Sequence, residues 1–173
     1  MTVQRLFSDL TNTLASPRKF RVRYRSEAAF EDDVWNVIRA RCKRHFGRQR
    51  LSRVVLTSHQ RNQGSDERKA WQEFLRSTPG PDVQALGSKN RLDIVVRCEP
   101  HDSIGIEVKW LSSRGHAAKL TQGLGQAVLA LANRQRTVLL VHCGSVPVTQ
   151  RRELRTIARR ICDGSATRLI VVP

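Results

Sequence analysis

The chain has 173 residues and a net charge of +16, because 31 Lys and Arg outnumber 15 Asp and Glu. That length suits one domain with one sizeable core, and the hydrophobic content of 39% is ordinary for a globular protein. No run of about 18 apolar residues is present, so no membrane partner is expected. So strong a positive charge points to a polyanionic partner, most simply nucleic acid. A protein that is merely basic is the alternative.

The cysteines and the N-terminus bear on the cellular compartment. Cys42, Cys98, Cys143 and Cys162 lack the paired spacing of a zinc site. The N-terminus is polar and broken by charges, which does not resemble a signal peptide. We therefore expect free thiols and a cytoplasmic protein, since disulfides persist in oxidising compartments.

The N-terminal part of the chain combines an apolar stripe with a basic segment. Residues 2–14 carry apolar side chains at near-helical spacing, which predicts an amphipathic helix docked on the core or on a second subunit. Residues 16–25, SPRKFRVRYR, are dense in Arg and Lys and interleaved with Phe20 and Tyr24. This segment is either an arm that contacts phosphates, with an aromatic ring stacking on bases, or a solvated basic edge strand.

A long helix is predicted next. Ser26 is a good N-cap for a helix of about 20 residues that begins at Glu27. Its apolar side chains fall on one stripe. Glu27 and Glu31 lie one turn apart on the flank of that apolar face, whereas a surface glutamate normally lies opposite it. Both acids would also stabilise a helix N-terminus through its dipole, so a purely structural role stays open.

A buried strand and an insertion are predicted before the central motif. Residues 51–59 are typical of a buried strand, and residues 61–88 form the insertion, with a short helix at 65–76. The sequence TPGP ends that helix. Asp82 follows a proline here, but we assign it to a loop and exclude it from the candidate site.

Residues 90–110, NRLDIVVRCEPHDSIGIEVKW, predict two strands joined by a turn. Asp93 lies inside the first strand, where a carboxylate is normally costly. Glu107 and Lys109 lie two residues apart in the second strand, so their side chains point to the same side. If the strands are neighbours, two carboxylates and a lysine converge.

This convergence suggests a chemistry. Two carboxylates a few ångströms apart repel each other unless a proton or a cation lies between them. Carboxylate oxygens are ligands that Mg²⁺ prefers, and a metal held there can activate water and stabilise charge on a phosphoryl group. The lysine would orient the attacking water or neutralise the developing charge. In the structural alternative, Glu107 and Lys109 lie on a solvated edge strand and Asp93 pairs with an arginine.

Asp93, followed by Glu107-Val108-Lys109 on the next strand, resembles the active-site signature of the PD-(D/E)XK nuclease superfamily, which has the restriction-endonuclease-like fold. The resemblance implies a Mg²⁺-dependent phosphodiesterase in which Mn²⁺ can substitute. Asp93, Glu107 and the backbone carbonyl of Val108 would hold the metal, and Lys109 would be the catalytic lysine. The residue before Asp93 is Leu92, where the signature has a proline.

The same resemblance assigns roles to two helices. The first core helix of such nucleases often supplies an acid to the metal site. Glu31 fits that habit best, because apolar residues follow it at +3, +4 and +7, and Glu27 is the reserve. Many subfamilies place a glutamine on the helix after the lysine. Gln122 fits that spacing and Gln126 is next, although both could simply be solvated.

The rest of the chain predicts alternating helices and strands. Gly123 and Gly125 weaken a helix expected at about residues 120–133, so close packing or close backbone approach is expected at them. Three further elements follow, a strand buried on both faces, a helix with a basic outer face and a final strand, at residues 137–143, 148–161 and 167–172.

We therefore expect an α/β protein with a restriction-endonuclease-like three-layer α/β/α sandwich around a central mixed sheet. It would span residues 26–173, after an N-terminal helix and basic arm at 1–25. The expected function is endonucleolytic hydrolysis of DNA, and the alternative is a catalytically inactive nuclease fold that only binds DNA or RNA. A homodimer would suit duplex cutting, which needs two active sites. The residues expected to contact nucleic acid are Arg21, Arg23, Arg25, Lys89, Arg91, Arg114, Lys119 and Gln126.

Overall fold

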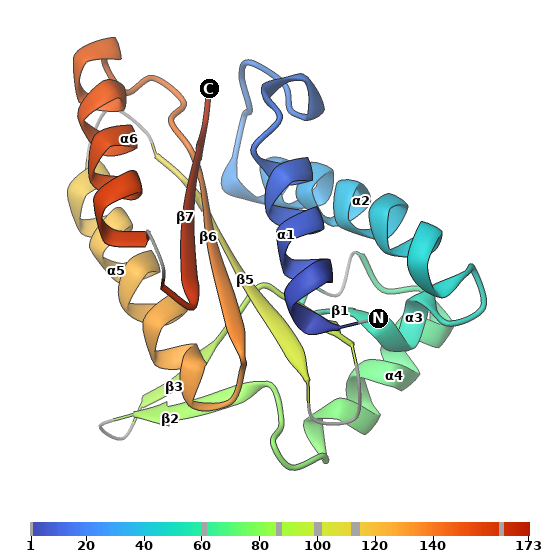
Figure 1. The fold of residues 1–173 in the computed structure, drawn as a ribbon. Coiled ribbons are helices and arrows are strands. Elements are labelled where there is room, and N and C mark those ends of the chain that lie inside the picture. Colours follow the sequence, from blue (N-terminus) through green and yellow to red (C-terminus); the bar gives the residue numbers. More distant parts are fainter. Residues whose placement is uncertain (1, 60–61, 86–87, 99–101, 112–114, 163–164) are drawn as a thin grey trace.

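The computed structural model describes residues 2–59, 62–85, 88–98, 102–111, 115–162 and 165–173. Its centre is a five-stranded sheet in the order β1-β4-β5-β6-β7 (Figure 1). The strands are β1 (Val55–Thr57), β4 (Ile94–Arg97), β5 (Ser103–Trp110), β6 (Arg136–His142) and β7 (Thr167–Val172). Strands β1, β4 and β5 pair antiparallel, whereas β5, β6 and β7 pair parallel. The predicted α/β class with a central mixed sheet is confirmed.

Two helices, α1 (Val3–Leu14) and α2 (Glu27–Phe46), cover one face of the sheet (Figure 1). The Ala29 amide donates to Ser26 Oγ at 3.2 Å, so the predicted N-cap of α2 is confirmed. The first helix docks on the core of this chain, which was one of the two predicted places for it. Its core side chains and those of α2 pack against alternate residues of β5. The fully buried side chains here include Leu6, Leu10 and Leu14 of α1, Phe30 and Ile38 of α2, and Ile104 and Ile106 of β5.

The other face of the sheet packs against α5 (His116–Leu129) and α6 (Val148–Cys162) (Figure 1). A 3-10 turn, η3 (Ala130–Ala132), extends α5. These helices connect the parallel strands, as crossover connections require. Strand β6 is buried on both faces, with Val138 and Leu140 on one side and Leu139 and Val141 on the other. The prediction of a central buried strand is confirmed.

The segment between α2 and β4 departs most from the prediction. The expected strand at residues 51–59 is a short helix, α3 (Leu51–Val54), followed by only three strand residues. The helix predicted in the insertion is present as α4 (Ser65–Leu75). After it, β2 (Asp82–Ala85) and β3 (Ser88–Arg91) form a separate two-stranded sheet that was not predicted. Their sequences, DVQA and SKNR, lack the apolar alternation that marks a strand.

The basic segment before α2 is not an edge strand. It contains a 3-10 turn, η1 (Pro17–Lys19), and irregular backbone. Phe20 and Tyr24 are buried in the core, and the Tyr24 hydroxyl donates to Asp33 Oδ2 at 2.8 Å. The expectation that either ring stacks on a base is therefore wrong, because both rings fill the space under α2. In the described parts of the chain, no helix is both long enough and apolar enough to cross a membrane.

Candidate functional site

The structure brings Asp93 next to the strand that carries Glu107 and Lys109. Asp93 lies immediately before β4 instead of inside it. Its Oδ2 accepts a hydrogen bond from the Val108 amide at 2.8 Å. Because the N–H and C=O of one strand residue point to the same edge, the Val108 carbonyl also lies on the side of Asp93. Asp93 therefore sits beside the middle of the Glu-Val-Lys triplet, and the predicted proximity of the two strands is confirmed.

Glu107 and Lys109 lie side by side on the face of β5 that α5 covers. Lys109 Nζ donates to Glu107 Oε1 at 2.5 Å, and the two side chains are 11% and 1% exposed. The alternative of a solvated edge strand is therefore wrong, since β5 lies between β4 and β6. The second carboxylate oxygen, Glu107 Oε2, is buried and accepts no hydrogen bond from the part of the chain that the structure describes.

The electrostatics of this pair favour an additional positive charge. Burial raises the pKa of Glu107 to about 8, the charge of Asp93 adds to the shift, and Lys109 opposes it. Burial lowers the pKa of the Lys109 amine, but Glu107 and then Asp93 outweigh it, so the net shift is upward. Lys109 therefore keeps its proton more strongly than a free lysine does, and Glu107 retains a proton that an isolated glutamate would lose.

The two acids of α2 have different surroundings. Glu31 is only 5% exposed and reaches the candidate site. Glu27 is partly exposed, and its Oε2 accepts from the Trp110 amide at 3.0 Å and lies 3.5 Å from Lys119 Nζ. Of the two, Glu31 is the acid next to Asp93, while Glu27 lies beside the end of β5.

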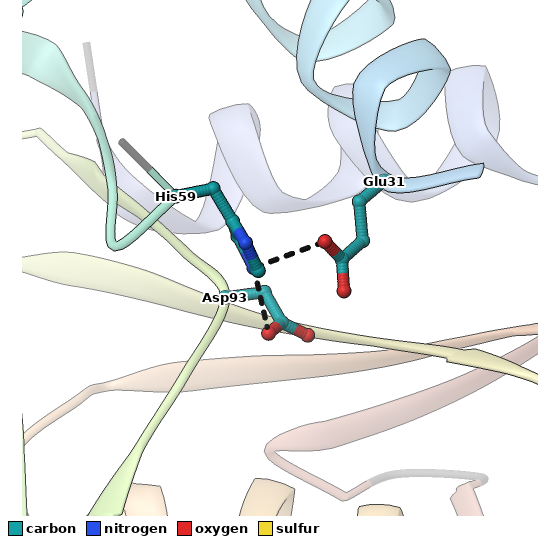
Figure 2. A group of neighbouring side chains, drawn as sticks. All are labelled: Glu31, His59 and Asp93. Atoms are coloured by element: carbon teal, nitrogen blue, oxygen red, sulfur yellow. Dashed lines mark hydrogen bonds and ion pairs between the residues drawn. The ribbon is translucent and has the colours of Figure 1, made fainter. Parts of the chain in front are cut away.

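His59 joins Glu31 to Asp93 (Figure 2). Its Nε2 lies 3.0 Å from Glu31 Oε2 and 3.4 Å from Asp93 Oδ1. The hydrogen bond to Asp93, followed by that to Glu31, raises the pKa of His59 to about 10. In this arrangement the imidazole carries a proton and neutralises part of the charge of the two carboxylates.

The same three residues can hold a metal ion. One ligand atom from each of Glu31, His59 and Asp93 lies within 4.8 Å of the others, and Glu107 does not belong to this group. An octahedral ion with bonds of about 2.1 Å places neighbouring ligands about 3 Å apart, which is close to the two distances from His59 Nε2. Carboxylates with one imidazole suit a divalent cation, and the nitrogen favours Mn²⁺ and its neighbours over Mg²⁺.

Sequence reasoning gave His59 no role. It follows β1 by two residues, and β1 pairs antiparallel with β4 so that Thr57 lies opposite Ile94. The Thr57 hydroxyl and the Ser58 amide both donate to the Asp93 carbonyl, which fixes His59 beside Asp93. His59 lies at the end of the predicted strand at residues 51–59, but the sequence does not tell that this strand pairs with the one that follows Asp93.

The glutamines of α5 differ in burial. Gln122 is exposed, whereas Gln126 is half-buried, and its Oε1 is buried without a donor among the described residues. Gly123, which contacts Lys109, precedes Gln126 by three residues, so Gln126 lies nearly one turn further along the same side of the helix. Of the two, Gln126 is therefore the one with a buried polar atom near the helix face that Gly123 belongs to.

The residues expected to contact nucleic acid come from several separate segments of the chain. Arg23, Arg25 and Lys89 are exposed. Arg21 and Arg91 are engaged by Asp33 and Asp82, at 3.0 Å and 2.6 Å. The remaining two cations differ, since Lys119 is partly exposed beside Glu27 and Arg114 lies outside the described residues.

Comparisons with models of protein families, with curated proteins and with solved structures found no match. The function is therefore inferred from the geometry of the site and the charge of the chain.

Proposed function

We propose that this protein is a metal-dependent nuclease that hydrolyses phosphodiester bonds in DNA, with a restriction-endonuclease-like fold. The observation that carries the proposal is the position of the Asp93 carboxylate. Its Oδ1 lies beside His59, which also contacts Glu31, and its Oδ2 binds the amide between Glu107 and Lys109. Three other segments of the chain, which carry Glu31, His59 and the Glu107–Lys109 triplet, thus meet around one carboxylate.

The residues divide naturally between ion binding and charge stabilisation. Glu31, His59 and Asp93 would hold the ion, and the Val108 carbonyl, on the side of Asp93, would be a further ligand. Glu107, which the resemblance also makes a ligand, lies outside this group. A divalent cation bound there would lower the pKa of a bound water and stabilise negative charge on the scissile phosphate. Mn²⁺ suits the mixed ligand set, and Mg²⁺ is the alternative.

Lys109 would act on the substrate side of this group. Its ammonium is held by Glu107 Oε1 at 2.5 Å, so it is charged and pre-oriented. A fixed ammonium in a buried site stabilises the charge that develops on a phosphoryl oxygen, and it also orients a nearby water. Lys109 therefore supplies the positive charge that the chain itself contributes to the reaction.

The charge favours a nucleic-acid substrate, and DNA is the one that we propose. The net charge of +16 provides the sequence-independent attraction that phosphate backbones require. Exposed Arg23, Arg25 and Lys89 would position the strand. No module for reading base edges is evident in the sequence, so we expect binding to follow DNA structure more than DNA sequence.

The test is a cleavage assay on plasmid, linear, branched and single-stranded DNA, and on RNA, with Mg²⁺ or Mn²⁺. Cleavage should disappear in Asp93→Ala and Lys109→Ala. Glu153→Ala should retain it, because Glu153 is an exposed side chain of α6 and belongs to none of the groups described above. Equal cleavage by wild type and both site variants would contradict the proposal, since the activity would then come from elsewhere.

A nucleic-acid-binding protein without catalysis is the second candidate. The observation in its favour is the His59 imidazole, which with a pKa of about 10 carries a proton and offsets part of the charge of Glu31 and Asp93 without any metal. Calorimetry with Mn²⁺ separates the two candidates. Absence of metal binding, together with tight binding of DNA, would establish this second candidate and contradict the first.

A further inference from the structure

Gly123 is the point where helix α5 contacts the stem of Lys109. It is buried, unlike most of the outer face of α5. A Cβ added at this position would lie 2.8 Å from Lys109 Cγ and 3.3 Å from Lys109 Cε. It would also lie 2.9 Å from Leu139 Cδ1 on β6. The Lys109 side chain therefore runs directly over bare helix backbone.

The two close neighbours respond differently to an added methyl group. Leu139 Cδ1 is the tip of a side chain that can rotate. Lys109 Cγ is only two bonds from the strand backbone, so it can move only by changing its side-chain rotamer or by shifting β5. Either change redirects the ammonium, which at present lies 2.5 Å from Glu107 Oε1.

Gly125 provides an internal comparison on the same helix. It is exposed, and a Cβ there would have no neighbour within 4 Å. Each glycine costs a helix interior about 1 kcal/mol relative to alanine. Helix propensity therefore favours replacing both, and only Gly123 has a contact that opposes the change.

We propose that Gly123 is a positioning residue, whose missing side chain fixes the direction in which Lys109 presents its ammonium. Its consequence for catalysis rests on the proposed nuclease function, whereas the contact itself does not. A side chain at this position would displace Lys109 from Glu107 and leave the carboxylate without its partner.

The contact can be tested without any activity measurement. Gly123→Ala should lower Tm by about 3–6 °C, and Gly125→Ala should raise it by about 2 °C. In a Lys109→Ala background, which removes the obstructing atoms, Gly123→Ala should lower Tm by less than half as much. An equal decrease in both backgrounds would overturn the proposal, because Leu139 alone would then exclude the methyl group.

Folding of the single variant is not required for a decision. If Gly123→Ala fails to fold, recovery of folding in Gly123→Ala with Lys109→Ala supports the proposal. Failure of both to fold overturns it.

The kinetic test uses the same pair of glycines. Gly123→Ala should lower kcat about 10- to 100-fold with KM and Mn²⁺ affinity unchanged, because a displacement of about 1 Å is enough for such a loss. Gly125→Ala should match wild type. Unchanged kcat in a folded Gly123→Ala would overturn the positioning role. If the wild type cleaves nothing, the nuclease proposal has failed. The Tm comparison in the wild-type and Lys109→Ala backgrounds then still tests whether Gly123 makes room for Lys109.

Discussion

Two clusters of charged residues in this protein contain a histidine and a carboxylate, and they differ in the ratio of acids to basic side chains. Between α1 and α2, Asp9 accepts from Arg41 Nε at 2.5 Å and lies 2.7 Å from His45 Nε2. In the candidate site, three carboxylates from Glu31, Asp93 and Glu107 share His59 and Lys109. One guanidinium and one imidazole lie against one acid in the first cluster, whereas one ammonium and one imidazolium lie among three acids in the second.

The consequences for protonation differ accordingly. The hydrogen bond from Arg41 lowers the pKa of Asp9 to about 2, although burial opposes the shift. Burial raises the pKa of Glu107 to about 8, with Asp93 adding to it. The Asp9 cluster is therefore an ordinary ion pair that stabilises the fold, and the site cluster costs stability. Residues that cost stability and remain buried are candidates for function.

The largest expected difference between the clusters is in catalysis. Asp93→Asn should lower the cleavage rate by about 1000-fold, because an amide is a poor metal ligand and cannot balance His59. Asp9→Asn should leave the rate unchanged. Initial rates on the best DNA substrate, with Mn²⁺ in excess, measure both. Comparable losses in the two variants would indicate a general folding defect and contradict the assignment of Asp93.

The histidines of the two clusters offer the next comparison. His59→Asn should weaken Mn²⁺ binding about 10-fold and should weaken Mg²⁺ binding less, because Mg²⁺ gains little from an imidazole. His45→Asn should change neither affinity. Calorimetric titration measures both ions. Stronger Mn²⁺ binding in His59→Asn would show that the imidazolium competes with the ion for Glu31 and Asp93.

The charged core of the site was predictable because it depends on local periodicity. The alternation of β5 places Glu107 and Lys109 on one face, and the stripe of α2 directs attention to Glu31. His59 was not predictable in this way, because its position depends on the pairing of β1 with β4, which the local sequence does not encode. Periodicity within one segment predicts which side chains share a face, but it does not predict which strands pair.

The errors in the fold have the same origin. The sheet of β2 and β3 has no apolar alternation to reveal it, because its side chains are largely polar. Because their neighbours are basic, Phe20 and Tyr24 were expected to stack on bases or to belong to a solvated edge strand, yet both rings are buried in the core. Close packing at Gly123 was expected from its position in a helix and is confirmed, but the partner, Lys109, emerged only from the structure. At Gly125 the same expectation is wrong.

The ion pair of Asp9 should affect stability in acid. Its folded pKa of about 2 lies below the ordinary value of 3.8, so its contribution is present above pH 3.8 and is lost as the pH falls to about 2. Asp9→Asn should lower the free energy of unfolding by about 1–2 kcal/mol at pH 7. Urea unfolding at pH 7 and at pH 2 measures the loss. A difference that persists at pH 2 would show that the charge is not its source.

Glu107 should show the opposite dependence on pH. Its folded pKa of about 8 lies above the ordinary value of 4.5, so the folded state keeps a proton that the unfolded state releases, and stability falls as the pH rises from 4.5 to 8. Glu107→Gln removes this titration and should raise the free energy of unfolding by about 1 kcal/mol at pH 8, with little effect at pH 4.5. Urea unfolding of the metal-free protein at the two pH values measures it, with Glu153→Gln, on an exposed side chain of α6, as the matched control. Destabilisation at pH 8 would mean that the ion pair with Lys109 outweighs burial, and the site would then resemble the Asp9 cluster.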